Sequence, residues 1–257
     1  MQPTLSATLR TADRALQILQ QFRRPGQSWT VSAIAEQLGL HRSTASRLIS
    51  TLLARGFLER AGGEGLRLGP EAIRLGTIAI AGSELMAVAA PVIQALAQHT
   101  GEAVTIAVAS GEQVLTVAEA PGKHFISSRD WIGVATPAHC TADGKVLLAY
   151  GALAPVTGQP QPLTPATIVD ATALEQELAV VRRRGWATAH GELELGLHGV
   201  AAPVHSGERC VAALCISGPE YRFSGASEDR LAPRCLEAAG QLRRRLGESP
   251  GHVEPAA

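Results

Sequence analysis

The chain lacks any long, uninterrupted apolar segment. Its two longest mostly apolar stretches, residues 72–81 and 85–97, are separated by Gly82, Ser83 and Glu84, and each is shorter than the roughly 18 residues that a membrane-spanning helix needs. The first ten residues also lack the apolar core of a secretory signal peptide. We therefore expect a cytoplasmic protein that makes no contact with a membrane.

Cysteine and aromatic residues are scarce. Aromatic residues make up 4% of the chain, and the four cysteines, Cys140, Cys210, Cys215 and Cys235, include no Cys-x-x-Cys pair. This excludes a dense disulfide framework and favours free, buried thiols. Cys210 and Cys215 are five residues apart in a strand-like run, so alternation is expected to place them on opposite faces, where they cannot bridge each other.

The net charge is +0, but the charges are unevenly distributed along the chain. Residues 1–70 contain nine arginines and four acidic residues, a net charge of +5, and the remaining residues carry −5. A basic first quarter indicates a module that binds a polyanion such as DNA, and chance clustering on a solvated face is the alternative. With 257 residues and 46% hydrophobic content, the chain is large enough for two folded domains.

Hydrophobic periodicity divides the chain into two parts. The first part is predicted to contain three helices, a hairpin and an apolar helix, over residues 11–22, 30–38, 41–55, 57–68 and 71–81. The second part is predicted to be α+β, with helices over 85–100, 144–151, 172–184 and 228–246 and strands over 104–109, 113–118, 186–189, 199–204 and 210–217. The predicted domains are residues 10–70 and 84–247, joined by a helical linker over 71–83.

Residues 30–55 have the pattern of a helix-turn-helix. Two short helices flank a turn at Gly39, and Ala35 is small enough to let the helices approach closely. One face of the second helix is apolar, and the opposite face presents Arg42, Ser43, Ser46, Arg47 and Ser50. Such side chains suit base edges and phosphates. The hairpin that follows would be a wing that brings Arg60 or Arg67 to DNA; the alternative is an ordinary helix pair with a solvated face.

Several short segments recur in the same order in a known family of proteins. In the first part they are residues 14–19, 34–40, 43–49 and 55–60, with linker matches at 68–70 and 74–76. In the second part they are residues 136–149, with shorter matches at 163–165, 184–187, 200–204 and 216–219. Over about residues 10–247 the chain resembles the IclR family of bacterial transcription regulators.

This resemblance implies an α+β fold class, with an N-terminal winged helix-turn-helix, a helical linker and a C-terminal GAF-like α+β domain. It implies a transcription regulator, more commonly a repressor, and not an enzyme. The partners would be double-stranded operator DNA, a small organic or aromatic acid as effector and a second copy of the chain in a homodimer or homotetramer. No cofactor and no metal are implied.

The resemblance also assigns residues to the two binding sites. The DNA-binding residues would be Arg42, Ser43, Thr44, Ser46, Arg47, Arg60 and Arg67. The effector-binding residues would be Ala142, Asp143, Gly144, Ala189, Leu197, Gly199, Cys215 and Ser217. Ala189 stands where many members that bind small acids have Asp, Gly199 where Cys or Ser is usual, and Cys215 where Ser is usual. A pocket with fewer fixed polar groups would favour a larger or more apolar ligand.

Other constellations favour ordinary structural roles. His139 and Cys140 are adjacent, so their side chains point in different directions and do not form a nucleophile–base pair. His124, His139, His190 and His198 share the second part with the cysteines, but no pair has metal-ligand spacing. The alternative function is an enzyme that processes a small acid and uses its winged helix only for assembly.

The apolar helical stretch over residues 71–101 cannot be solvated alone. We expect it to pack against a second copy of the chain, so that a ligand-driven shift changes the separation of the two recognition helices. The alternative is a helix that packs only within its own chain.

Overall fold

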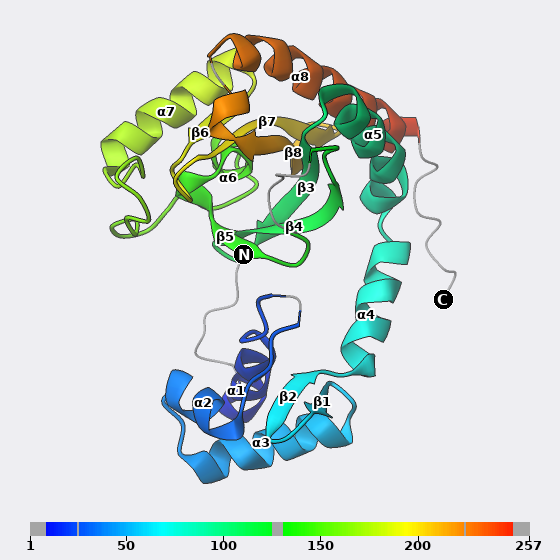
Figure 1. Ribbon diagram of the computed structural model, residues 1–257, viewed down its shortest axis with the longest axis vertical. Coiled ribbons are helices and arrows are strands. Elements are labelled where there is room, and N and C mark those ends of the chain that lie inside the picture. The colour runs from blue at the N-terminus through cyan, green and yellow to red at the C-terminus, as the bar shows by residue number, and fades with distance from the viewer. Residues whose placement is uncertain (1–8, 25, 125–130, 224, 249–257) are drawn as a thin grey trace. The chain divides into compact units, whose positions relative to one another are not determined.

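The computed structural model describes residues 9–24, 26–124, 131–223 and 225–248. It divides into two compact units, residues 1–83 and 84–257. Figure 1 labels the elements of both units.

The first unit combines short helices with a two-stranded antiparallel sheet. Its elements are α1 (Arg10–Leu19), α2 (Val31–Gln37), α3 (Arg42–Ala54), β1 (Leu58–Ala61), β2 (Gly65–Leu68) and α4 (Pro70–Ala81). The hydroxyl of Thr30 accepts a hydrogen bond from the Ala33 N–H at 3.2 Å and so caps the N-terminus of α2. Gly39, with φ of +59°, turns the chain from α2 into α3.

One apolar core holds these elements together. Fully buried side chains come from α1, α2, α3 and both strands: Ile18, Ile34, Ala45, Ile49, Leu58 and Leu66. The strands pair from Leu58 with Leu68 to Ala61 with Gly65, and Trp29 adds an isolated antiparallel bridge to Leu66. The hairpin and the segment before α2 are therefore fixed to the helix pair.

The second unit is built on a six-stranded antiparallel sheet with the order β5-β4-β3-β8-β7-β6. Its strands are β3 (Ala103–Ser110), β4 (Gln113–Ala120), β5 (Ala135–Pro137), β6 (Ala187–His190), β7 (Leu197–Ser206) and β8 (Arg209–Pro219). Its α-helices are α5 (Glu84–Thr100), α6 (Ala142–Ala149), α7 (Ala171–Arg184) and α8 (Gly225–Glu248).

Helices cover both faces of this sheet (Figure 1). On one face, α5 and α8 pack against alternate strand residues such as Val104, Val200 and Leu214. On the other face, α6 and α7 pack against Ala201 and Ala213. This three-layer arrangement is the predicted α+β fold of the second part.

The structure corrects two details of the prediction. The strand β5 was missed, because three residues are too few for a visible alternation. The placement of Cys210 and Cys215 on opposite faces of β8 was wrong: both side chains lie on the face that packs against α6 and α7. The register shifts between Val204 and His205, which pair with Ala212 and Cys210, so Val211 is an extra residue that resets the alternation. All four cysteines are free.

Among the described residues, no single helix is both long enough and apolar enough to cross a membrane. The helices α4 and α5 satisfy those criteria only when counted together, and the chain is broken between them at Gly82 and Ser83.

Candidate functional site

Helix α3 has one buried face and one polar face. Ala45, Leu48, Ile49 and Leu52 are buried in the core of the first unit. The predicted DNA contacts on the other face are exposed, with Thr44 half-buried: Arg42, Ser43, Ser46 and Arg47. The helix contains two arginines and no acidic residue. This face therefore offers hydroxyl donors and guanidinium groups to an anionic partner.

The start of α3 is fixed by a local hydrogen-bond network. His41 is the N-cap residue, and its Nδ1 accepts a bond from the Ser43 N–H at 3.3 Å and lies 2.7 Å from the Ser43 hydroxyl oxygen. The Thr51 hydroxyl donates to the carbonyl oxygen of Arg47 at 3.1 Å. The His41–Ser43 contacts therefore fix the first turn of the helix.

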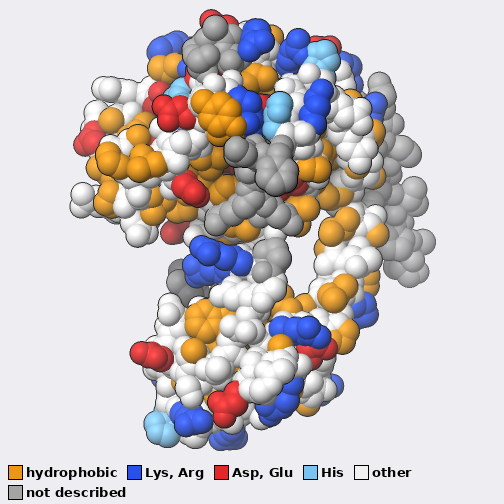
Figure 2. Space-filling model, viewed as in Figure 1, with side chains coloured by type: hydrophobic (Ala, Val, Ile, Leu, Met, Phe, Trp, Pro, Cys, Tyr) orange, Lys and Arg blue, Asp and Glu red, His pale blue; other side chains and the backbone are white. Residues whose placement is uncertain are grey.

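The two arginines of the hairpin have different surroundings. The Arg67 Nε lies 2.7 Å from the Glu59 carboxylate on the neighbouring strand, where the two residues are direct cross-strand partners. Arg60 is exposed and pairs in register with Leu66, so it projects from the other face of the hairpin. Figure 2 shows arginine side chains spread over this unit.

A cavity lies on the α6 face of the sheet in the second unit. Seven of the eight residues that the resemblance assigned to the effector site line it: Ala142, Asp143, Ala189, Leu197, Gly199, Cys215 and Ser217. Strand register brings them together, since Ala189 pairs with Gly199 and Gly199 pairs with Ser217. The space open to the centre of a water-sized sphere is about 60 Å³.

Gly144, the eighth residue, packs beside the cavity instead of lining it. Its N–H donates to the Thr141 hydroxyl at 3.1 Å and to the Asp143 carboxylate at 2.9 Å. A Cβ atom at this position would lie 2.2 Å from the carbonyl oxygen of Ala138, far inside a normal contact. Glycine is therefore required where α6 meets the preceding turn.

The cavity is also lined by polar residues outside the predicted set: Thr105, Thr116, Thr136, Thr141 and His198. Thr136 and Thr141 lie in segment 136–149, which matches the family's pocket segment. Thr105 and Thr116 come from strands that are distant in sequence, and only the pairing of β3 with β8 and of β4 with β3 and β5 brings them to the cavity. No local pattern in the sequence signals these two residues.

Burial changes the acid–base properties of the cavity wall. It raises the pKa of Asp143, an effect that hydrogen bonds from the Thr141 hydroxyl and the Gly144 N–H oppose. Burial, together with the nearby Glu192 and Asp143 carboxylates, raises the pKa of the Cys140 thiol to about 12. A thiol with so high a pKa is not an activated nucleophile. His139 does not help it, because His139 Nε2 lies 3.1 Å from the Gln161 carbonyl oxygen.

Beside the cavity, a buried ion pair connects α6 to the β6 side of the sheet. The Lys145 Nζ lies 2.7 Å from a Glu192 carboxylate oxygen and 3.0 Å from the Thr188 carbonyl oxygen, and only 2% of the Lys145 side chain is exposed. Glu177 on α7 lies 3.9 Å from the same ammonium group. The pair joins two of the elements that carry cavity residues.

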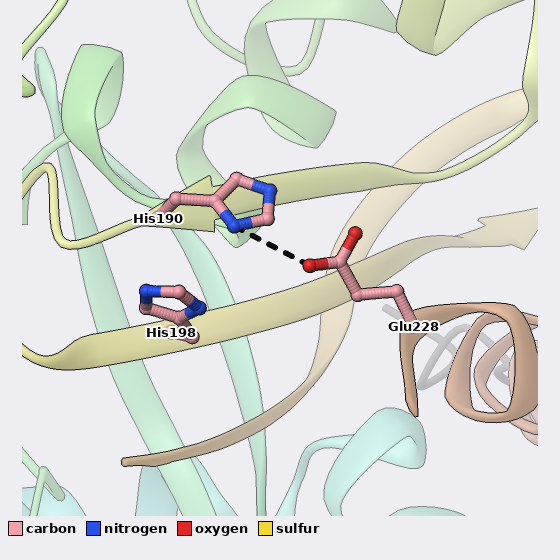
Figure 3. Close-up of side chains that lie close together, drawn as sticks. All are labelled: His190, His198 and Glu228. Atoms are coloured by element: carbon pink, nitrogen blue, oxygen red, sulfur yellow. Dashed lines mark ion pairs between the residues drawn. The ribbon is translucent and has the colours of Figure 1, made fainter. Parts of the chain in front are cut away.

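His190, His198 and Glu228 form a further cluster (Figure 3). In the sequence the two histidines show no ligand spacing, because neither an i+4 nor a Cys-x-x-Cys pattern connects them. The antiparallel register makes them direct partners instead, across the turn between β6 and β7. Within the described part of the chain, this is the group of three that could hold a metal ion.

A winged helix-turn-helix followed by an α+β domain that holds a cavity is the organisation of a transcription regulator. The comparisons with known proteins give the family. The model of the IclR helix-turn-helix domain matches residues 11–62, and the model of the bacterial transcriptional regulator IclR C-terminal domain matches residues 77–244. The chain belongs to the IclR family, as its sequence motifs predict.

Relatives cover nearly the whole chain. The HTH-type transcriptional regulator BhcR of Paracoccus denitrificans is 30% identical over 245 residues, covering 92% of this chain and 87% of that protein. The transcriptional repressor IclR of Escherichia coli is 28% identical and covers 89% of this chain and 87% of its own. These relatives are transcription regulators and not enzymes, so the enzyme alternative is not supported.

Solved structures agree in fold. An IclR transcriptional regulator from Silicibacter sp. TM1040 superposes with a TM-score of 0.83 at 27% identity and covers 94% of this chain and 98% of its own. An IclR homolog from Microbacterium hydrocarbonoxydans, complexed with 4-hydroxybenzoate, has a TM-score of 0.77 at 27% identity and covers 93% and 100%.

Proposed function

We propose that this protein is a cytoplasmic repressor that binds operator DNA as a homodimer, and that a small organic or aromatic acid in the cavity changes its affinity for that DNA. The observation that carries the proposal is the exposed face of α3, which is rich in hydroxyl and guanidinium groups and free of acidic residues. In this proposal residues 10–70 bind DNA, 71–83 link the domains and 84–247 bind the effector and oligomerise.

The residues at the start of α3 would contact DNA in the major groove. Arg42 and Arg47 are assigned to phosphates or base edges, and Ser43, Thr44 and Ser46 to positional or base contacts. Arg60 is the stronger candidate for a DNA contact on the wing, because the guanidinium group of Arg67 is paired with the Glu59 carboxylate. Arg67 would contact DNA only by exchanging that partner.

The test is fluorescence anisotropy of the full chain on the intergenic DNA beside its own gene, titrated with salt. We expect a Kd near 10⁻⁸ M or tighter that weakens steeply with salt, against roughly 10⁻⁴–10⁻⁶ M for non-specific binding. Arg47→Ala should cost about 1–3 kcal/mol if Arg47 contacts a base. Arg183→Ala, an exposed arginine on α7, is the matched control. Unchanged affinity in Arg47→Ala would retire the assignment of Arg47 as a DNA contact.

The effector would bind against the first turn of α6. Ala142 and Asp143 begin this helix and line the cavity, and the partial positive charge at a helix N-terminus favours an anion. Threonine hydroxyls and Ser217 supply further hydrogen bonds. The cavity volume is about 60 Å³, whereas one water molecule requires roughly 10–15 Å³. This small volume favours a compact, polar acid over the larger ligand that the residues at positions 189, 199 and 215 suggest.

Effector binding is tested by adding acids to the protein–DNA complex. Glyoxylate is the compact probe, and 4-hydroxybenzoate, which is bound in the structure of the Microbacterium relative, is the aromatic probe. We expect glyoxylate to release the DNA at a lower concentration than 4-hydroxybenzoate does. We expect Gly199→Leu, which fills the cavity, to abolish the release while DNA affinity stays unchanged. Release that persists in Gly199→Leu would place the effector elsewhere.

The homodimer would use α4. All twelve residues of α4 are described and none is buried, although the helix carries Ile73, Leu75, Ile78 and Ile80. Four large apolar side chains on one short exposed helix are typical of an interaction surface. A second copy of the helix is the proposed occupant, because a dimer places two copies of α3 on the two halves of a palindromic operator.

A further inference from the structure

We propose that His190, His198 and Glu228 form a binding site for a divalent transition-metal ion of the Zn²⁺ class. Each residue offers one ligand atom, and these atoms all lie within 4.8 Å of one another. Figure 3 shows both imidazole rings and the carboxylate directed toward a common gap. The site lies outside the groups used for DNA binding.

Three different elements of one rigid scaffold supply the ligands. His190 is the last residue of β6, and His198 is its direct cross-strand partner on β7. Side chains of directly paired residues project from the same face of a sheet. Glu228 reaches them from the first turn of α8, the helix that packs along β7. Backbone pairing and helix packing therefore hold the three side chains together without a metal.

One of the observed distances matches that of a coordination sphere. A tetrahedral zinc ion with bonds of about 2.1 Å separates its ligand atoms by about 3.4 Å. The His190 Nδ1 lies 3.3 Å from the Glu228 carboxylate oxygen. The two imidazole rings lie edge to face, with centroids 4.9 Å apart and planes at 83°, and the third ligand atom lies within 4.8 Å of the other two.

An ordinary ion pair between His190 and Glu228 leaves part of the cluster unexplained. His198 Nδ1 is buried and has no hydrogen-bond partner among the described residues. A buried imidazole nitrogen without a partner is costly, and a metal ion would satisfy it through a lone pair. The orphaned nitrogen is thus a second observation, independent of the ion pair, that points to a ligand.

Arg184 is the cation that acts against metal binding, because its charge interacts with Glu228. Its guanidinium group is engaged elsewhere: it donates to the Trp186 carbonyl oxygen at 2.6 Å and to the Thr188 hydroxyl at 3.2 Å, and it lies 3.6 Å from the Glu177 carboxylate. Glu228 therefore keeps a carboxylate for an ion.

Two imidazoles and one carboxylate favour zinc and its neighbours in the first transition row over Mg²⁺ or Ca²⁺, which prefer oxygen ligands. Three protein ligands leave a coordination position for water or for an oxygen atom of a bound molecule.

The experiment measures Zn²⁺ binding to the metal-stripped full chain by competition with a chromophoric chelator. We expect one ion per chain, with weaker binding in His190→Ala, His198→Ala and Glu228→Gln. Removal of an indirect partner of a metal ligand already costs about 10–100-fold in affinity, so loss of a direct ligand should cost at least about tenfold. Substitution of Co²⁺ should give the visible absorption of a tetrahedral site.

His205→Ala is the matched control, since His205 lies on the same strand but pairs its ring with Tyr150. It should bind Zn²⁺ like the parent chain. Far-ultraviolet circular dichroism of each metal-free variant shows whether it is folded. If a histidine variant is not folded, Glu228→Gln, which preserves side-chain size, still tests the site. Absence of Zn²⁺ binding in the parent chain, or equal binding by folded Glu228→Gln, would overturn the assignment.

Discussion

The buried Lys145–Glu192 pair allows a quantitative prediction about the scaffold of the cavity. Lys145→Met removes the cation and keeps most of the apolar volume of the side chain. The Glu192 carboxylate, which is 7% exposed, then retains only the distant N–H of His190 at 3.3 Å. Its other oxygen, Oε2, already has no hydrogen-bond partner among the described residues.

The expected loss follows from this geometry. Removing one partner of a buried ion pair typically costs about 3–5 kcal/mol, because the remaining charge is left without compensation. A domain of this size loses roughly 2–4 °C in Tm per kcal/mol, so the expected decrease is about 6–20 °C. Against a total stability of about 5–15 kcal/mol, this is a large effect.

Differential scanning calorimetry of the full chain measures the effect, since the transition of the second unit is the one that should move. The double variant Lys145→Met/Glu192→Leu is the control: with both charges removed, it should recover most of the lost stability. The reasoning is refuted if the single variant loses less than about 1 kcal/mol, or if the double variant is no more stable than the single one.

Three further predictions concern the acid, the thiols and the exposed helix. Burial raises the folded-state pKa of Asp143 above its ordinary value of 3.8, so the folded protein loses stability as the pH rises from 3.8 through that folded-state pKa. Asp143→Asn keeps an acceptor for the Gly144 N–H and should be more stable than the parent protein to urea at pH 7. A less stable variant would contradict this. Burial raises the pKa of the Cys140 thiol to about 12 and that of the Cys210 thiol to about 11. At pH 8 no more than about one of these thiols in a thousand is a thiolate, so Ellman's reagent should react slowly until the chain is unfolded. Rapid labelling of the native protein would refute the burial argument. Ile73→Glu on α4, where Ile73 is 69% exposed, should convert the proposed dimer to a monomer in light scattering, while Leu195→Glu at a 72% exposed position should leave it unchanged; a dimeric Ile73→Glu variant would exclude α4 as the interface.

Local signals predicted most of the fold. The Thr30 cap, the Gly39 turn and the period of α3 are properties of neighbouring residues, so the helix-turn-helix was visible in the sequence. Strand alternation likewise predicted most of the second sheet. The extra residue at Val211 was not predicted, since a bulge depends on the partner strand.

The candidate sites were predictable to different degrees. The resemblance identified cavity residues around Ala142 because they form contiguous motifs. The hydroxyl groups of Thr105 and Thr116 were not identified, because only strand register brings them to the cavity. The same limit hid the cluster of His190, His198 and Glu228, whose third member is separated from the histidines by the whole of β8.

The contrast between Gly144 and Gly199 has a consequence for how new ligand preferences can evolve or be engineered. A side chain at Gly144 would collide with backbone, whereas a Cβ at Gly199 would meet the Cys215 Sγ at 3.4 Å, the Ala142 Cβ at 3.6 Å and the Ile216 carbonyl oxygen at 3.7 Å. The support of α6 beside the cavity is therefore closed to variation, whereas position 199 in the cavity lining can accept a larger residue. A biosensor library should accordingly diversify position 199 and its neighbour in register, Ala189, and leave the glycine of α6 untouched.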